Sequence, residues 1–262
     1  MKRKWLFGTN WKMSKNAREA AEYAVILRER LLRMKLEETV QVFVLPPFTS
    51  IGIVKEMSGG AFWVGAQNMH WEESGPFTGE ISASMLAELG IVLAQVGHAE
   101  RREMFYETDA MINKKVLAAL RAGFRPLVCI GESAMDRDFK VARETCARQL
   151  RIALNNVPED DVEQIIIAYE PAWAIGMHGS IAAPSFVRDM KFHFGAILAD
   201  MFGANRSQQI PTLYGGSVSS DGATEMLLDS HMDGLFVGRS ALDSMVFANL
   251  IESCVSAAAS RS

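Results

Sequence analysis

One carboxylate in the chain occupies a position suited to a base that takes a proton from carbon. Glu170 follows the apolar run IIIA at residues 165–168 and a tyrosine, and Pro171 comes directly after it. A short apolar run that ends at a proline is typical of a strand in a parallel sheet covered on both faces. In α/β barrels, catalytic groups lie at the carboxyl ends of such strands. An acid that only turns the chain toward solvent would occupy the same position, so Glu170 alone decides nothing.

Other polar groups suited to proton transfer follow other apolar runs. Asn10 and Lys12 come after the first run, and His98 comes after the fourth. A carboxylate can take a proton from carbon, an imidazole can polarise the adjacent oxygen, and a lysine attracts an anionic substrate. A histidine that caps the backbone and a solvated lysine are the ordinary alternatives. The catalytic interpretation is favoured because all these groups would share one rim of a barrel.

The last two apolar runs are followed by groups that suit a bound anion. Gly215, Gly216 and Ser217 follow the seventh run, and Gly238 and Arg239 follow the eighth. Glycines allow backbone N–H groups to approach an anion closely, and barrels often bind phosphate at these two loops. A tight turn is the alternative interpretation of the glycine pair.

Three further features are interpreted as supports of this rim. The loop after Glu170 contains Trp173, Gly176 and Gly179, the composition of a lid with an apolar latch and two swivels. Glu100 belongs to a charge cluster that predicts an ion network positioning Lys12. Cys129 lies inside an apolar run and is interpreted as a packing residue rather than a nucleophile.

Short apolar runs alternate with longer amphipathic segments along the whole chain. The predicted strands are residues 5–8, 41–45, 62–66, 91–96, 125–130, 164–169, 209–214 and 234–237, and the clearest predicted helices are 17–34, 111–120, 141–154, 186–201 and 244–256. About eight strand–helix units predict an α/β fold, a closed (β/α)8 barrel that forms a single domain over residues 1–262. An open doubly wound sheet usually has fewer units, and neither G-x-G-x-x-G nor a Walker A sequence occurs. The long loop at 67–79 is expected to be functional or interfacial.

Composition excludes several classes of protein. The 262 residues carry a formal net charge of −4, which gives no basic field for nucleic acid beyond the first four residues, MKRK. No run reaches the roughly 20 apolar residues of a membrane span. The three cysteines, Cys129, Cys146 and Cys254, are odd in number and lack metal-ligand spacing. They predict a reducing, cytoplasmic setting without a disulfide framework.

Over roughly residues 5–250 the chain resembles the triosephosphate isomerase family. Seven motifs similar to those of the family occur in its order: NWKM at 10–13, FTGEI at 77–81, GHAERR at 97–102, CIGE at 129–132, YEPAWAIG at 169–176, YGGSV at 214–218 and DGLFVG at 233–238. Seven motifs in register are far more specific than any one of them. The resemblance implies a TIM barrel.

The resemblance also implies a reaction and its residues. Glu170 would abstract the proton next to a carbonyl and return it to the neighbouring carbon. His98, as a neutral imidazole, would stabilise the intermediate enediolate together with Asn10 and Lys12. The lid, residues 173–182, would close over the substrate, because an enediol phosphate exposed to water would eliminate phosphate.

Further implications concern ligands and assembly. Backbone groups at Gly176, Ser217 and Gly238 would hold the phosphate of a small phosphorylated sugar, and no metal or organic cofactor would be needed. The family is dimeric or larger, so a homodimer or higher homo-oligomer is expected. Thr78 on the long loop would reach the partner's active site.

The chain departs from the family in the loops that would hold substrate. The lid tip, usually GTGKTA, is GMHGSIA at 176–182, and the interval to Pro184 is one residue longer. Arg239 replaces the second glycine after strand eight, Ala99 replaces a serine, and Ser14 stands where asparagine is common. His178 in the lid is assigned no role. A neutral variant of the family would keep these changes without consequence.

The substrate interpretation therefore stays open between two sugars. Dihydroxyacetone phosphate, the triose of glycolysis and gluconeogenesis, is preferred because it is the family's predominant substrate. A four-carbon ketose phosphate of polyol catabolism, such as that of erythritol, is the alternative. A barrel that only binds a sugar phosphate is the third and weakest interpretation, because the residues equivalent to the catalytic groups are intact.

Overall fold

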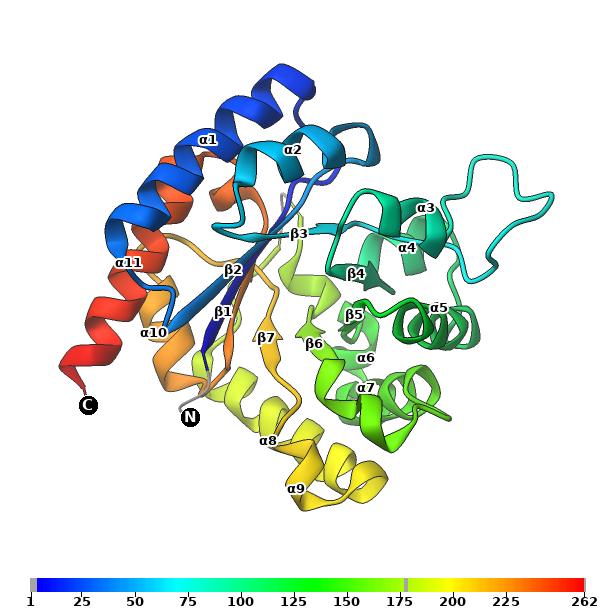
Figure 1. Cartoon of the computed structure of the whole chain (residues 1–262). Coiled ribbons are helices and arrows are strands. Elements are labelled where there is room, and N and C mark those ends of the chain that lie inside the picture. Colours follow the sequence, from blue (N-terminus) through cyan, green and yellow to red (C-terminus); the bar gives the residue numbers. More distant parts are fainter. Residues whose placement is uncertain (1–3, 177–178, 262) are drawn as a thin grey trace.

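Eight parallel strands close into one barrel in the order in which they occur in the sequence. The structure is a computed structural model that describes residues 4–176 and 179–261. Each strand pairs with the next one along the chain, and β8 pairs with β1 to complete the ring. Figure 1 shows the helices arranged around the outside of the strands. The predicted α/β barrel is confirmed.

The strands are β1 (Trp5–Asn10), β2 (Val40–Leu45), β3 (Trp63–Ala66), β4 (Leu93–Val96), β5 (Arg125–Ile130), β6 (Ile166–Tyr169), β7 (Thr212–Tyr214) and β8 (Gly234–Val237). The helices are α1 (Ala17–Met34), α2 (Ile51–Ser58), α3 (Ala83–Glu88), α4 (Ala99–Met104), α5 (Asp109–Arg121), α6 (Ala134–Asp138), α7 (Ala142–Ala153), α8 (Pro184–Phe202), α9 (Ala204–Ser207), α10 (Ala223–Asp229) and α11 (Ser244–Ser260). Four 3₁₀ turns complete the description: η1 (Phe48–Ser50), η2 (Glu159–Gln164), η3 (Ala172–Ala174) and η4 (Arg239–Ala241).

Four predicted strands begin too early. The third and fourth strands begin one and two residues later than predicted, at Trp63 and Leu93, and local turns delay the sixth and seventh. Residue 164 ends the 3₁₀ turn η2, which follows Pro158, so the sixth strand begins at Ile166. Residues 209 and 210 close turns onto α9, and the seventh strand begins only after Pro211. Proline supplies no N–H to a ladder, which is why pairing starts beyond it. Six short helices, α2, α3, α4, α6, α9 and α10, were too short to give a clear periodic pattern.

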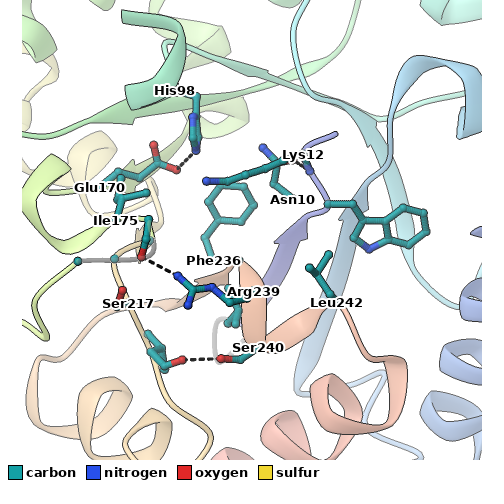
Figure 2. A pocket seen from close by; sticks show the side chains of 18 of the residues that line it. Asn10, Lys12, His98, Glu170, Ile175, Ser217, Phe236, Arg239, Ser240 and Leu242 are labelled. Atoms are coloured by element: carbon teal, nitrogen blue, oxygen red, sulfur yellow. Dashed lines mark hydrogen bonds and ion pairs between the residues drawn. The ribbon is translucent and has the colours of Figure 1, made fainter. Parts of the chain in front are cut away.

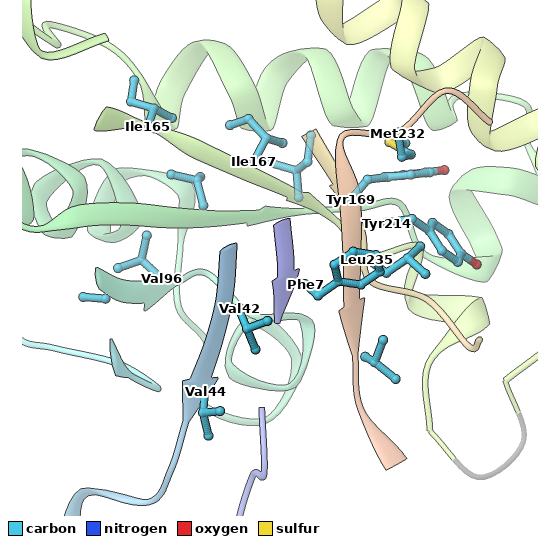
Figure 3. Packing of buried hydrophobic residues seen from close by; sticks show 14 of the residues in the cluster. Phe7, Val42, Val44, Val96, Ile165, Ile167, Tyr169, Tyr214, Met232 and Leu235 are labelled. Atoms are coloured by element: carbon cyan, nitrogen blue, oxygen red, sulfur yellow. The ribbon is translucent and has the colours of Figure 1, made fainter. Parts of the chain in front are cut away.

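The strands separate two apolar layers. Alternate residues point into the barrel, among them Leu6, Phe43 and Phe236, whose two phenyl rings stack with centroids 5.6 Å apart. The intervening residues pack against the helices, as Figure 3 shows for several of them. Gly8 is required by this filling, because a Cβ there would lie 1.9 Å from the ring of Phe43. The interior is therefore packed, and a site can form only at its ends.

The long loop after β3 projects from the barrel beside α3 (Figure 1). No helix or strand is assigned from residue 67 to residue 82, and residues 72–80 are exposed. Its base is fixed by His70, whose ring stacks against Trp71 at 4.2 Å and packs against Phe77 at 4.3 Å. None of the helices in the described ranges is long and apolar enough to cross a membrane.

Candidate active site

A cavity of about 490 Å³ lies at the carboxyl ends of the strands. Its walls come from the loops after β1, β4, β6, β7 and β8, as Figure 2 shows. Twelve of the residues singled out from the sequence line it: Asn10, Lys12, Ser14, His98, Glu170, Gly176, Gly179, Gly215, Gly216, Ser217, Gly238 and Arg239. The topology therefore brings together groups that are up to 229 positions apart in the chain. Glu100, Cys129 and Thr78 lie outside its lining.

Glu170 is held at the end of β6 with its side chain inside the protein. Its backbone N–H donates to the carbonyl of Ile130 at 2.7 Å, and the residue is 2% exposed. One carboxylate oxygen, Oε1, lies 3.7 Å from Nε2 of His98. The other, Oε2, is buried and has no hydrogen-bond partner among the described residues. Glu170 thus presents an unsatisfied carboxylate oxygen beside the cavity.

Burial raises the pKa of Glu170 above that of an ordinary glutamate. The neighbouring His98, a hydrogen bond with Cys129 and the charge of Lys12 all oppose this shift. Proton transfer is most effective when the pKa of the base approaches the working pH. The environment of Glu170 therefore suits a general base rather than a surface acid.

Two glycines after β7 make room for neighbouring side chains, and one of these is the base. A Cβ at Gly215 would lie 2.8 Å from Cγ of Glu170, and one at Gly216 would lie 2.2 Å from the hydroxyl oxygen of Tyr214. The N–H of Gly215 is already donated to the carbonyl of Tyr169 at 2.8 Å. Gly215 therefore has a packing role beside Glu170, and Gly216 has one beside Tyr214, which the sequence analysis did not anticipate.

His98 occupies the N-cap of α4 and presents a defined tautomer. Its Nδ1 accepts the backbone N–H of Glu100 at 3.2 Å, so this nitrogen carries no proton. The imidazole is then neutral, with its hydrogen on Nε2, the nitrogen that faces Glu170. The 3.7 Å separation is too long for a direct hydrogen bond. A substrate oxygen beside the base could accept this hydrogen.

The loop after β1 is folded by its own side chains. Oδ1 of Asn10 accepts the backbone N–H of Lys12 at 2.6 Å, and Lys12 has the left-handed backbone φ of 53°. Nζ of Lys12 bonds to Oε1 of Glu100 at 2.5 Å. Gln67 donates to the carbonyl of Lys12 at 3.0 Å. Positive φ is rare outside glycine, and such backbone is typical of functional sites.

The charged residues of α4 bind different partners. Glu100 alone bonds to Lys12, whereas Nε of Arg101 donates to Oε1 of Glu107 at 2.6 Å. The same oxygen accepts from the buried Lys115 at 2.5 Å, and burial lowers the pKa of Lys115. This buried pair fixes α4 to α5, and hence the positions of His98 and Glu100.

Trp173, the first residue of the lid, is hydrogen-bonded to the loop after β5. Nε1 of Trp173 donates to Oε1 of Glu132 at 2.7 Å, and the hydroxyl of Tyr169 donates to Oε2 of the same carboxylate at 3.0 Å. Burial raises the pKa of Glu132, while the bonds from Trp173 and Tyr169 oppose that shift. Residues 177 and 178, the altered lid tip with His178, lie outside the described residues.

Two more bonds tie the lid to the expected phosphate side. The backbone N–H of Ser217 donates to the carbonyl of Ala174 at 2.7 Å, and Nη2 of Arg239 donates to the carbonyl of Gly176 at 2.7 Å. Figure 2 shows the Arg239 side chain directed toward the lid. The N–H of Ser217 could hold a phosphate only after the Ala174 carbonyl moves, so its expected role stays a prediction.

Sequence reasoning missed residues that contact the catalytic groups. Cys129 is buried as expected for packing, but its Sγ accepts from Nε2 of Gln95 at 3.2 Å, and Oε1 of Gln95 accepts from Asn10 at 2.7 Å. Burial raises the pKa of the Cys129 thiol. Gln95 is the one polar residue in the run at 91–96, and this interruption could have identified it. Phe236 in the cavity wall gave no such signal, because apolar residues are normal in β8.

Comparison with known proteins places the chain among isomerases of phosphorylated sugars. The family model described as triosephosphate isomerase matches residues 5–254. A triosephosphate isomerase of Caldanaerobacter subterraneus is 38% identical over 250 residues, 95% of this chain and 99% of that protein. An L-erythrulose-1-phosphate isomerase of Rhizobium rhizogenes is 40% identical over 255 residues, 96% of this chain and 95% of that protein. A triosephosphate isomerase of Acetivibrio thermocellus is 40% identical over 243 residues, 92% and 95% of the two chains.

Proposed function

We propose, because the chain belongs to the triosephosphate isomerase family, that it interconverts dihydroxyacetone phosphate and glyceraldehyde 3-phosphate. One observation carries this proposal. The buried carboxylate of Glu170, with Oε2 unsatisfied among the described residues, lies beside the Nε2–H of a neutral His98 at the mouth of the cavity. Proton transfer between two neighbouring carbons requires a base at the carbon and a hydrogen-bond donor at the adjacent oxygen of the substrate.

The geometry supports the following sequence of steps. Glu170 takes the proton from the carbon next to the carbonyl, the C–H electron pair forms a C=C bond, and the carbonyl π electrons move to oxygen. The enediolate accepts hydrogen bonds from Nε2 of His98 and from the Asn10 amide, while Lys12 supplies positive charge. The hydroxyl proton on the oxygen of the first carbon passes to the oxygen of the second, with Nε2 of His98 as the relay. Glu170 then gives its proton to the second carbon while the new carbonyl forms on the first, so atoms and charge balance without a cofactor.

The phosphate would lie at the opposite end of the cavity. Gly176, Gly216, Ser217 and Gly238 line that end with backbone groups, and Arg239 adds a guanidinium. A phosphate dianion would compete with the Gly176 carbonyl for this guanidinium, because a charged acceptor forms the stronger hydrogen bond. Closure of the lid over the substrate would exclude water and prevent loss of phosphate from the enediolate.

A four-carbon ketose phosphate is the second candidate. The relative named L-erythrulose-1-phosphate isomerase is as similar to this chain as the triosephosphate isomerases are. The cavity lining also includes Ser14, Ser240 and Leu242 around Arg239, where hydroxyl groups could meet a longer polyol. On this interpretation the enzyme belongs to erythritol catabolism, and on the first it belongs to glycolysis and gluconeogenesis.

Parallel measurement of kcat/KM on dihydroxyacetone phosphate and L-erythrulose 1-phosphate separates the candidates. A triose value near the diffusional ceiling of about 10⁸ M⁻¹s⁻¹ supports the first proposal. A tetrulose value at least tenfold above the triose value supports the second. If both sugars bind without exchange of carbon-bound hydrogen with deuterated solvent, the chain is a non-catalytic binding barrel. Glu170→Gln should lower an authentic activity by about 10²- to 10⁴-fold.

We also propose a homodimer or a larger homo-oligomer. Apolar side chains are exposed on the loops after β1, β3 and β4: Met13 is 99% exposed, Tyr106 81% and Phe77 39%. The salt bridge between Lys12 and Glu100 links the first of these loops to α4, the helix that precedes Tyr106, and the exposed Thr78 adjoins Phe77 in sequence. Such side chains on connected loops suit a second copy of the chain.

Sedimentation velocity at micromolar concentration tests this assembly. We expect a dimer or larger species, and Tyr106→Asp should shift it toward monomer because a charge would be buried at the contact. A fully active wild-type monomer would contradict the proposal.

We further propose a cytoplasmic location, which is supported by three buried free cysteines. Cell fractionation tests this location, and detection of the protein in a membrane or secreted fraction would refute it.

A further inference from the structure

A glutamine lies inside the barrel directly beneath the proposed active site. Gln95 in β4 is completely buried. Its neighbours Ala94 and Val96 face the helices, whereas Leu93 and Gln95 alternate into the interior, where Leu127, Ile166 and Leu213 form part of an apolar cluster. A buried amide is costly unless its hydrogen bonds are made. A leucine would fill this position without that requirement, so the amide calls for an explanation.

One end of Gln95 fixes the side chain of Asn10. Oε1 of Gln95 accepts from Nδ2 of Asn10 at 2.7 Å, while Oδ1 of Asn10 accepts from the backbone N–H of Lys12 at 2.6 Å. Together these two bonds determine which end of the Asn10 amide carries the hydrogens. The second N–H of Nδ2 is then available to the cavity that Asn10 lines, as Figure 2 allows the reader to follow.

The other end of Gln95 acts on Cys129. Nε2 of Gln95 donates to Sγ of Cys129 at 3.2 Å, so the sulfur serves as an acceptor on that side. Cys129 also neighbours Glu170, and this neighbour opposes the effect of burial on the pKa of Glu170. The hydrogen bonds thus run in one direction, from Asn10 to Gln95 and from Gln95 to Cys129, the neighbour of the base.

We infer that Gln95 is a positioning residue, which sets the orientation of the Asn10 amide and of the Cys129 thiol and so couples the oxyanion-stabilising side of the site to its base. Gln95 does not line the cavity, and it acts only through these two neighbours. The inference rests on the proposed function, because it assigns a role in the same proton transfer.

The substitution Gln95→Leu removes both bonds at nearly constant volume, and Gln95→Met provides a second variant of similar length. The matched control is Thr9→Val in β1. Thr9 is also fully buried, it adjoins Asn10 in sequence, and its hydroxyl has no hydrogen-bond partner within the described ranges. The assay uses whichever of the two sugar phosphates the wild type converts faster.

We expect kcat to fall about 10- to 100-fold in both Gln95 variants, as for a displacement of catalytic groups by a fraction of an ångström to 1 Å. KM should stay within threefold, because the phosphate side is untouched. Binding of phosphoglycolate, whose carboxylate resembles the enediolate, should weaken about tenfold, whereas binding of inorganic phosphate should not change. Thr9→Val should match the wild type in all four measurements.

The pH profile distinguishes positioning from a purely structural role. Glu170 is surrounded by Cys129, His98 and Lys12, and only the thiol is redirected by the substitution. Displacement of the Cys129 thiol weakens an interaction that favours the carboxylate, so the low-pH limb of kcat/KM should move to higher pH. A structural role alone would lower the unfolding temperature and leave this limb in place.

Two distinguishable outcomes would overturn the inference, the first without and the second together with the proposed function. A Gln95→Leu enzyme with kcat within threefold of an active wild type and an unmoved low-pH limb would exclude the positioning role and leave the isomerase proposal intact. A wild type that converts neither sugar phosphate would remove both, because no proton transfer would exist for Gln95 to support.

Discussion

Gly215 offers a direct test of how closely the base is held, because its Cα faces the Glu170 side chain. In Gly215→Ala the new methyl would lie 2.8 Å from Cγ of Glu170, whereas ordinary contacts begin at about 3.4 Å. The two groups must therefore separate by about 0.6 Å. Gly215 itself does not have a positive φ, so alanine adds no backbone strain.

The displacement falls on Glu170 rather than on the rest of the site. Its side chain is 2% exposed and lies between the new methyl and Nε2 of His98, so it cannot move into solvent. A misplacement of about 1 Å costs about 100-fold in rate. A shift of 0.6 Å is then expected to lower kcat by about 10- to 50-fold, with KM changed less than threefold.

The assay is steady-state kinetics on the preferred sugar phosphate, together with thermal unfolding. Gly195→Ala in α8 is the matched control, because nothing lies within 4 Å of its added Cβ. That control should keep the wild-type kinetics and gain about 0.5–1 kcal/mol of stability from the helix. If Gly215→Ala folded normally and kept kcat within threefold of the wild type, Glu170 would tolerate the added methyl without losing its catalytic position. The argument that burial holds Glu170 in place would then fail.

Three further perturbations test the electrostatics and the lid. Glu170→Gln should raise the unfolding temperature at pH 8, because burial raises the folded-state pKa of Glu170 and the resulting loss of stability is complete above that pKa. The gain should shrink as calorimetry is carried to lower pH and vanish below the pKa of the unfolded chain. A less stable variant at pH 8 would refute this prediction. Arg239→Met removes a charge-assisted hydrogen bond, of a kind worth about 1.5–3 kcal/mol when buried. Since Arg239 is exposed, KM should rise only about tenfold, with kcat within threefold of the wild type. An unchanged KM would exclude a role for Arg239 in binding the phosphate. Trp173→Phe deletes the indole N–H that anchors the lid to Glu132, so the lid should exclude water less well and more inorganic phosphate should be released during turnover. A phosphate assay would measure this release. An unchanged ratio of phosphate released to sugar isomerised would contradict the prediction.

The positions of Asn10, His98 and Glu170 could be predicted from sequence because parallel topology determines them. When eight strands close in sequence order, every carboxyl end lies on the same rim, whatever the length of the connections. The strand edges were less predictable. Gln164 directly precedes the apolar residues of the sixth strand, so the sequence pattern includes it in that strand. In the structure its backbone ends a 3₁₀ turn that follows Pro158, because local hydrogen bonds, which periodicity does not reveal, determine its conformation.

The partners of the catalytic groups could not be predicted, because they are set by distances across the barrel. Asn10 and Gln95 are 85 positions apart, and Trp173 and Glu132 are 41 apart. No spacing rule relates such pairs. A buried glutamine or glutamate shows in sequence only as an interruption of an apolar run, and its partner becomes known when the strands are placed side by side.

This division bears on what distinguishes the two candidate substrates. The proton-transfer groups Glu170 and His98 are those that both reactions need, so their presence cannot decide between three and four carbons. Discrimination must come from groups that touch the remainder of the substrate or that orient the catalytic side chains. Arg239, bonded to the lid at Gly176, belongs to the first kind, and Gln95, bonded beneath Asn10, belongs to the second. If exchange of Arg239 alters the ratio of kcat/KM between the two sugars while exchange of Gln95 lowers both equally, specificity and proton transfer are carried by separate parts of one rim.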